Sequence, residues 1–83
     1  MRPDLVVEVI SPSSTRYDRV TKLRYYSQLR TPEYWIVDPQ ARTVERLVLG
    51  DGSYVIAESC IDSEVFRPPS FDGLEIPLAK LWE

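Results

Sequence analysis

The sequence lacks histidine, and among its 83 residues it has one cysteine, three glycines and no long apolar run. Without histidine, the chain cannot form a Ser-His-Asp triad, use a histidine general base or bind zinc through imidazole. Cys60 alone can form neither an internal disulfide nor a thiolate zinc site, so a reducing compartment is the default. Any chemistry must therefore depend on carboxylates, lysine, arginine, tyrosine or hydroxyl groups.

The length and the absence of targeting segments limit the class of protein. No run approaches the roughly 18–20 apolar residues of a membrane-spanning helix, and the start Met1-Arg2-Pro3-Asp4 does not resemble a signal peptide. We therefore expect a cytoplasmic protein with no membrane partner. A mass of 9.6 kDa is too small for two hydrophobic cores, so residues 1–83 are expected to form a single domain or part of one.

Charge is unevenly distributed along the chain, although the net charge is only −3. Residues 1–46 carry eight Lys/Arg against six Asp/Glu, whereas residues 47–83 carry two against seven. The basic excess is concentrated in one segment in which Asp18 is the single acid, and its bases are Arg16, Arg19, Lys22, Arg24 and Arg30. A basic helix can contact phosphate even in an acidic chain. The alternative is an ordinary solvated helix face.

Hydrophobic patterns predict a strand, a helix and a second strand in the first half of the chain. Residues 5–10 are β-branched and almost continuously apolar, which is typical of a strand covered on both faces. The hydroxyl-rich residues 11–15 break this strand and offer caps for a helix over about residues 17–30. A stripe at spacing three predicts which helix residues are buried: Val20, Leu23, Tyr26 and Leu29. Pro32 ends the helix, because the residue before proline avoids helical geometry.

The second half of the chain is predicted to be mostly strands. Residues 33–38 and 43–49 read as strands, and Gly50-Asp51-Gly52 predicts a hairpin to a further strand over residues 53–57. Residues 60–67 are ambiguous, with a short strand around Val65 as one alternative, and residues 78–82 are expected to form a last helical turn. The order predicts an α/β (α+β) fold, in which a β-α-β-β-β core forms a mixed sheet with its first two strands parallel.

Glu8 is the most informative candidate for chemistry, because it interrupts a strand that is expected to be buried. Burying an unpaired carboxylate costs several kcal/mol, roughly, so Glu8 needs a partner or a catalytic task. Asp4 lies on the same strand face, but about 13 Å away along a regular strand, which is too far for both to ligate one metal ion. The structural alternatives are a salt bridge from Glu8 to a helix base and a strand-entry turn at Asp4.

Lys22 is the second candidate, because helical geometry places it within the arc of the predicted buried stripe. A lysine there either extends along the edge of the apolar surface or reaches toward a carboxylate. Since the helix follows the strand of Glu8 directly, an ammonium group near Glu8 is expected. Asp18 and Lys22 also form an i, i+4 pair, which is a common surface feature worth a few tenths of a kcal/mol.

Three motifs in this order resemble the Uma-type putative restriction endonucleases of bacteria. They are PDLVVEVISPSS at residues 3–14, PEYWIVDP at residues 32–39 and DGLEIPL at residues 72–78. Between the first two motifs, Asp18, Lys22 and Tyr26 also match. The resemblance covers nearly the whole chain. It implies the PD-(D/E)XK nuclease fold and magnesium-dependent hydrolysis of DNA phosphodiester bonds.

The resemblance also implies roles for individual residues. In that superfamily two acidic residues on adjacent strands hold the metal, and a lysine positions or activates water. Glu8 matches the second acid and would ligate magnesium. The usual lysine position, two residues later, holds Ile10, and the resemblance implies that Lys22 on the helix takes that role. Arg16 and Arg19 would contact phosphates, and Asp4 would assist catalysis or hold the strand entry.

The resemblance is to the C-terminal half of these enzymes. It implies that family members carry roughly as many residues again upstream, including the aspartate that is their first metal ligand. We therefore expect a partial nuclease-like domain that is weakly active or inactive alone. The alternative is a non-enzymatic nucleic-acid-binding or assembly module with the nuclease fold. Without upstream strands, residues 5–10 are expected to form an open edge, through which the chain self-associates or pairs with a separate N-terminal piece.

Overall fold

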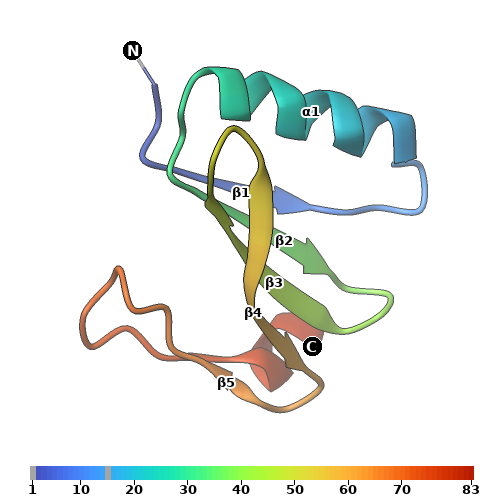
Figure 1. Cartoon of the computed structure of the whole chain (residues 1–83). Helices are drawn as coiled ribbons and strands as arrows, with labels where there is room; N and C mark the ends of the chain where they lie inside the picture. The colour runs from blue at the N-terminus through green and yellow to red at the C-terminus, as the bar shows by residue number, and fades with distance from the viewer. Residues whose placement is uncertain (1, 15) are drawn as a thin grey trace.

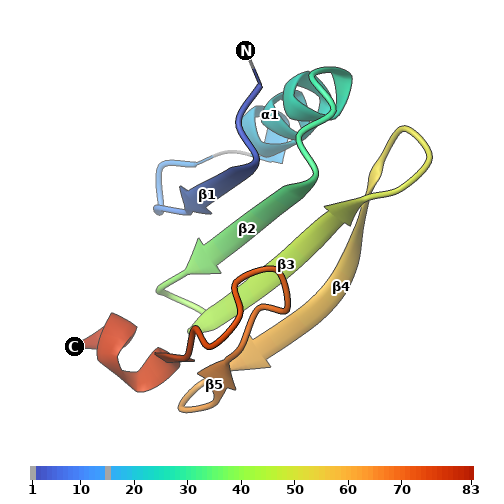
Figure 2. The ribbon, with the colours of Figure 1, turned by 90° about the vertical axis from the view of Figure 1, so that its left-hand side faces the viewer.

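A computed structural model describes residues 2–14 and 16–83 of the chain. A mixed sheet forms its body, with a helix on one face and the C-terminal segment on the other (Figures 1 and 2). The elements in chain order are β1 (Leu5–Val9), α1 (Arg16–Gln28), β2 (Glu33–Asp38), β3 (Thr43–Leu49), β4 (Tyr54–Ile61), β5 (Val65–Phe66), β6 (Ile76–Pro77) and the 3-10 helix η1 (Leu78–Trp82).

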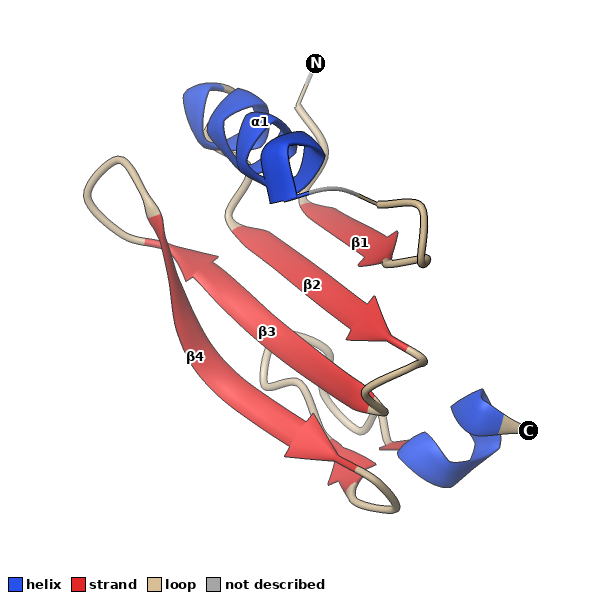
Figure 3. Cartoon of the chain, turned by 90° about the vertical axis from the view of Figure 1, so that its right-hand side faces the viewer, coloured by secondary structure: helices blue, strands red, loops and turns tan. Residues whose placement is uncertain are grey.

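The main sheet has the strand order β1-β2-β3-β4 (Figure 3). β1 and β2 are parallel, with Glu8 opposite Ile36, and they are joined through α1. The pairs β2–β3 and β3–β4 are antiparallel. The predicted mixed sheet with a β-α-β-β-β core is therefore confirmed.

Side-chain alternation along the strands divides the buried residues of this single domain into two clusters, one on each face of the sheet. Tyr34 and Trp35 are both buried and lie on opposite faces, because adjacent strand residues point in opposite directions. The face under α1 has a core of Tyr34, Ile36 and Leu47. On the other face, the C-terminal segment contributes Phe66 and Leu78 to a core of Trp35, Val44, Cys60, Phe66 and Leu78.

The helix contacts the sheet over a shorter stretch than its sequence pattern predicts. Leu23 and Tyr26 pack against the core under α1 as expected. Val20 and Leu29 are 40% and 36% exposed, so the prediction that they are buried is wrong. The central turn of the stripe contacts the sheet, and the two ends of the stripe extend beyond that contact.

Within the described residues, no helix is long and apolar enough to cross a membrane.

The end of α1 is set by a Schellman motif. The amide of Thr31 donates to the carbonyl of Tyr26 at 3.1 Å, and that of Arg30 donates to Ser27 at 3.0 Å. Arg30 has a φ of 63°, a left-handed conformation in which glycine is usual. The helix therefore ends at Gln28, two residues before the predicted end. Thr15, the last residue of the predicted capping cluster, lies outside the described residues.

Strand β4 is longer than predicted. The prediction ended it at residue 57, yet the strand continues to Ile61 and pairs Cys60 with Val44. The pairing register shifts between Arg46 and Leu47, so a β-bulge interrupts β4 in its middle. The register leaves Ala57, the residue at which the prediction ended the strand, without a partner on β3. The short strand around Val65 is confirmed as β5, which pairs with β6.

Strand β1 lies at an edge of the sheet. Among the described residues it pairs with β2 alone. Val7 and Val9 are 51% and 61% exposed, so the prediction that both faces of this strand are covered is wrong. The expectation of an open edge is confirmed. The apolar run therefore leaves one row of backbone groups and two valine side chains without a covering element.

Candidate active site

Glu8 and Lys22 are brought together by the β1–α1 connection. Glu8 lies on the same strand face as Val6 and Ile10, which pack against the core under α1. The helix crosses back over this face, and Lys22 Nζ lies 3.3 Å from Glu8 Oε2. The expectation that the ammonium group reaches this carboxylate is confirmed.

Tyr34 is a second partner of Glu8 that the sequence analysis missed. Its hydroxyl donates a hydrogen bond to Glu8 Oε1 at 2.5 Å. The Tyr34 side chain is completely buried, and this burial, followed by the hydrogen bond to Glu8, raises the pKa of its hydroxyl above the usual value. The available signal was a tyrosine in a central strand, because a buried phenol usually needs a hydrogen-bond partner.

The two partners hold Glu8 with different strength. The Glu8 side chain is 9% exposed, whereas that of Lys22 is 55% exposed. A hydrogen bond to a buried charged group contributes about 1.5–3 kcal/mol, while an ion pair with a largely exposed lysine contributes about 0–1 kcal/mol. Tyr34 therefore fixes the carboxylate, and Lys22 can leave Oε2 at little cost to stability.

The pair opens into a pocket of about 590 Å³ between β1 and α1. Besides Glu8, Lys22 and Tyr34, its lining comprises Val6, Val7, Val9, Thr21, Tyr25 and Tyr26. A charged pair at the wall of an otherwise largely apolar pocket is the usual arrangement of a small-molecule or catalytic site.

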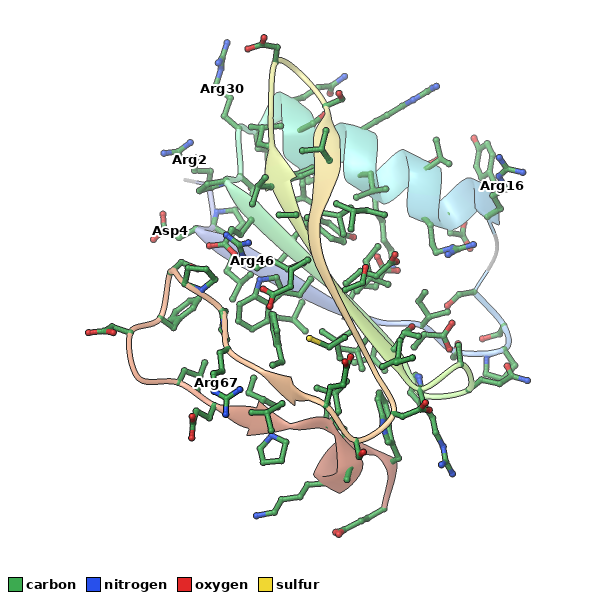
Figure 4. All side chains as sticks on the ribbon, turned by 60° about the horizontal axis from the view of Figure 1, so that its bottom comes forward. Arg2, Asp4, Arg16, Arg30, Arg46 and Arg67 are labelled. Carbon is green, nitrogen blue, oxygen red and sulfur yellow. The ribbon has the colours of Figure 1, made fainter. Side chains whose placement is uncertain are left out.

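The other three predicted site residues do not line this pocket. Asp4 is exposed at the start of β1, and Arg16 is exposed at the start of α1. Figure 4 shows them at opposite ends of β1. Arg19 is partly buried on α1 and also lies outside the pocket lining. The roles assigned to these three residues stay predictions.

For magnesium, which the resemblance implies, the described residues place one carboxylate in this pocket. Mg²⁺ binds to carboxylates and waters in near-octahedral geometry. Glu8 is the single carboxylate of the pocket, and each of its oxygens already accepts a hydrogen bond. Across residues 2–14 and 16–83, no three His, Cys, Asp or Glu side chains gather where they could hold a metal ion. The assignment of magnesium to Glu8 stays a prediction.

A second nearly buried carboxylate, that of Glu33, lies on the opposite face of the sheet and is held by hydrogen bonds. Glu33 Oε1 accepts hydrogen bonds from Arg46 Nε at 2.9 Å and from Trp35 Nε1 at 3.1 Å. Burial opposes ionisation, but the hydrogen bonds from Ser70, Trp35 and Arg46 hold the pKa of Glu33 below its usual value. Both charged side chains are nearly buried, and neither lines the pocket between β1 and α1.

The fold matches that of a solved nuclease-like protein. A putative nuclease from Anabaena variabilis, assigned to the DUF820 group, superimposes with a TM-score of 0.74 and 20% sequence identity. The match covers 99% of this chain and 45% of the Anabaena protein, so this chain spans less than half the length of that relative. No curated protein matches the sequence.

The family assignment follows from the sequence itself. The profile of the Uma2 family, described as putative restriction endonucleases, matches residues 2–79. The chain belongs to this family. The resemblance stated from the three motifs is therefore confirmed.

Removing the Tyr34 hydroxyl should destabilise the protein, because it leaves a buried carboxylate oxygen without its donor. We expect Tyr34→Phe to lower the free energy of unfolding by about 1–3 kcal/mol in urea titrations. The matched control is Tyr54→Phe, which removes a hydroxyl that donates to the neutral carbonyl of Thr31 at 2.7 Å. The control should cost less, about 0.5–1.5 kcal/mol.

The same variant should change the pH dependence of stability in alkali. The folded-state pKa of Tyr34 is raised from 10.0, so its contribution is complete below pH 10 and is lost as the pH rises toward the folded-state value. Tyr34→Phe should make the fall in unfolding free energy above pH 10 less steep. Equal destabilisation by both variants, with an unchanged alkaline slope, would contradict the role of Tyr34.

Proposed function

We propose that this chain carries part of the active site of a DNA nuclease, with Glu8 and Lys22 as its catalytic residues. The observation that supports this most is the Lys22–Glu8 contact at 3.3 Å in the wall of a pocket. Membership in the Uma2 family supports a nuclease, and the fold agrees. Hydrolysis of phosphodiester bonds in DNA is the proposed reaction.

The chemistry of the pair fits hydrolysis. A water molecule that donates to Glu8 Oε2 and accepts from the Lys22 ammonium would be oriented for attack on phosphorus. Lys22 is half-exposed and weakly held, so it can turn from Glu8 toward that water or toward a phosphate oxygen. Tyr34 keeps the Glu8 carboxylate in place while Lys22 moves.

We assign magnesium dependence to a protein assembled from this chain and a second carboxylate. The pocket supplies Glu8 alone, and Asp4 lies outside it. The second acid would then come from a further segment, joined to this chain or supplied separately. Consistent with this, the Anabaena relative has more than half of its length outside the match. The 83-residue chain alone should cleave weakly or not at all.

Substrate attraction is assigned to the basic helix. Arg16 and Arg19 precede Lys22 on α1, and Arg24 follows it, with Asp18 as the single acid of the helix. Such a segment attracts a polyanion even though the net charge of the chain is −3. In this proposal Arg16 and Arg19 contact phosphates outside the pocket.

A second candidate is a nucleic-acid-binding or assembly module that retains the fold without catalysis. The observation that favours it is the single carboxylate that the described residues place in the pocket, since the superfamily that the chain resembles holds its metal with two acids. This module would bind DNA through the same basic helix. The two candidates differ in whether any added carboxylate segment produces cleavage.

We further propose that β1 pairs with another strand, which in solutions of this chain alone is β1 of a second copy. β1 is regularly paired along its length, whereas the other edge strand, β4, is interrupted by its bulge. Bulges protect an edge from pairing, and a regular apolar edge invites it. Val7 and Val9 would gain cover from such pairing.

Cleavage should depend on both residues of the pair. The chain is mixed with the segment of the Anabaena protein that it does not match, and nicking of a supercoiled plasmid is measured with Mg²⁺. We expect Glu8→Gln and Lys22→Ala each to reduce the rate by about 10²–10⁴-fold. Circular dichroism should show that the fold is retained.

The matched control is Glu75→Gln, because Glu75 forms an exposed ion pair with Arg67 on another part of the surface. Its cleavage rate should equal that of the unmodified chain. Cleavage that survives both Glu8→Gln and Lys22→Ala would remove the pair from the mechanism. DNA binding without cleavage in any mixture would support the binding module instead.

Self-association should depend on β1 and not on β4. Light scattering of the chain at increasing concentration is expected to show a rising mass. Val9→Lys introduces a charge beside the open edge and should keep the chain monomeric. Val55→Lys, at a residue of β4 that is 53% exposed, is the matched control and should associate like the unmodified chain. A monomer at every concentration would contradict the proposal.

A further inference from the structure

Tyr25 is the most exposed aromatic residue of the pocket. It is 56% exposed and lies on α1, three residues after Lys22. Tyr26 and Tyr34, the other two aromatic residues of the lining, are partly and fully buried in the core under α1. Tyr25 is not one of the residues packed in that core, and unlike the more exposed Tyr17 it lines the pocket beside Lys22.

The ring of Tyr25 is held in an orientation that leaves a face available. It meets the ring of Tyr26 edge-to-face, with centroids 5.1 Å apart and an interplanar angle of 77°. In this geometry Tyr26 covers at most one face of Tyr25. Tyr26 is itself supported by Tyr34, at a centroid distance of 5.8 Å. The exposed ring is therefore attached to a rigid aromatic cluster.

The surroundings of Tyr25 match the parts of a nucleotide. The pocket volume of about 590 Å³ is in the range of small-ligand sites. Val6 provides apolar surface on the strand side of the pocket, and Lys22 provides a cation for phosphate. The bases of α1 complement a polyanion that continues beyond the pocket.

We propose that this pocket binds an unpaired nucleotide, with its base stacked on Tyr25 and its phosphate directed to Lys22. A base within a duplex has both faces covered by its neighbours, so its face becomes available only in a single strand or after extrusion. The inference rests on the proposed function, because a nuclease site supplies the reason for a nucleic-acid ligand. It adds the substrate class, namely single-stranded or locally unpaired DNA.

The test is a binding measurement that needs no cleavage. Fluorescence anisotropy of a labelled oligothymidine is recorded in EDTA with the unmodified chain and with its variants. Tyr25→Ala should weaken binding by about 5- to 150-fold, the effect expected for loss of one stacked base. Tyr25→Phe, which retains the ring, should bind like the unmodified chain. A duplex of the same sequence should bind more weakly, and Tyr25→Ala should not change its affinity.

Tyr17→Ala is the matched control. Tyr17 is a 78% exposed tyrosine on the same helix, outside the pocket lining, so its loss should leave oligothymidine binding unchanged. Equal effects of Tyr17→Ala and Tyr25→Ala would overturn the stacking proposal. If Lys22→Ala weakens binding while Tyr25→Ala does not, stacking fails and the nuclease proposal survives. If the unmodified chain binds neither single strand nor duplex, both proposals fail.

Discussion

A carboxylate in an otherwise apolar strand determines how β1, α1 and β2 are arranged around it. Glu8 is nearly buried, and such a group is stable only if its oxygens find donors. The structure supplies one donor from each neighbouring element, the Tyr34 hydroxyl from β2 and the Lys22 ammonium from α1. The parallel β1–α1–β2 unit is what brings these three side chains together. The pocket beside them follows from the same arrangement.

The unequal burial of its two partners distinguishes Glu8 from the other nearly buried carboxylate of the sheet. Tyr34 lies in the core and is supported by ring contacts to Tyr26 and Tyr54, so its position is fixed by packing. Lys22 is half-exposed and can move. The Glu33–Arg46 pair on the other face shows the contrast, since both of its members are nearly buried and neither lines the pocket beside Glu8. A fixed carboxylate beside a mobile cation suits a reaction, whereas a closed pair suits stability.

Much of the fold could be predicted from local sequence patterns, and the errors of that prediction have physical causes. The parallel β1–β2 pair and the antiparallel strands after it follow from the β-branched apolar runs, the hairpin signal and the rule for crossover connections. The length of β4 could not be predicted, because a bulge breaks its alternation. The exposure of Val20 and Leu29 depends on how far the sheet extends under α1, which no local pattern reports. At the site, the position of Lys22 on the helix predicted its contact with Glu8. The hydrogen bond from Tyr34 to Glu8 could not be predicted, because it depends on the register between β1 and β2.

The ion pair of Glu8 and Lys22 involves a nearly buried carboxylate, and the carboxyl carbon of Glu8 reports on it directly. Its NMR resonance can be measured at neutral pH in the unmodified chain and in the variants Lys22→Met and Lys80→Met, the second removing an exposed lysine of η1. The account predicts that the Glu8 resonance moves in Lys22→Met and stays in place in Lys80→Met. A Glu8 resonance that lies with those of solvent-exposed glutamates and does not change in Lys22→Met would contradict the ion pair of Glu8 and Lys22.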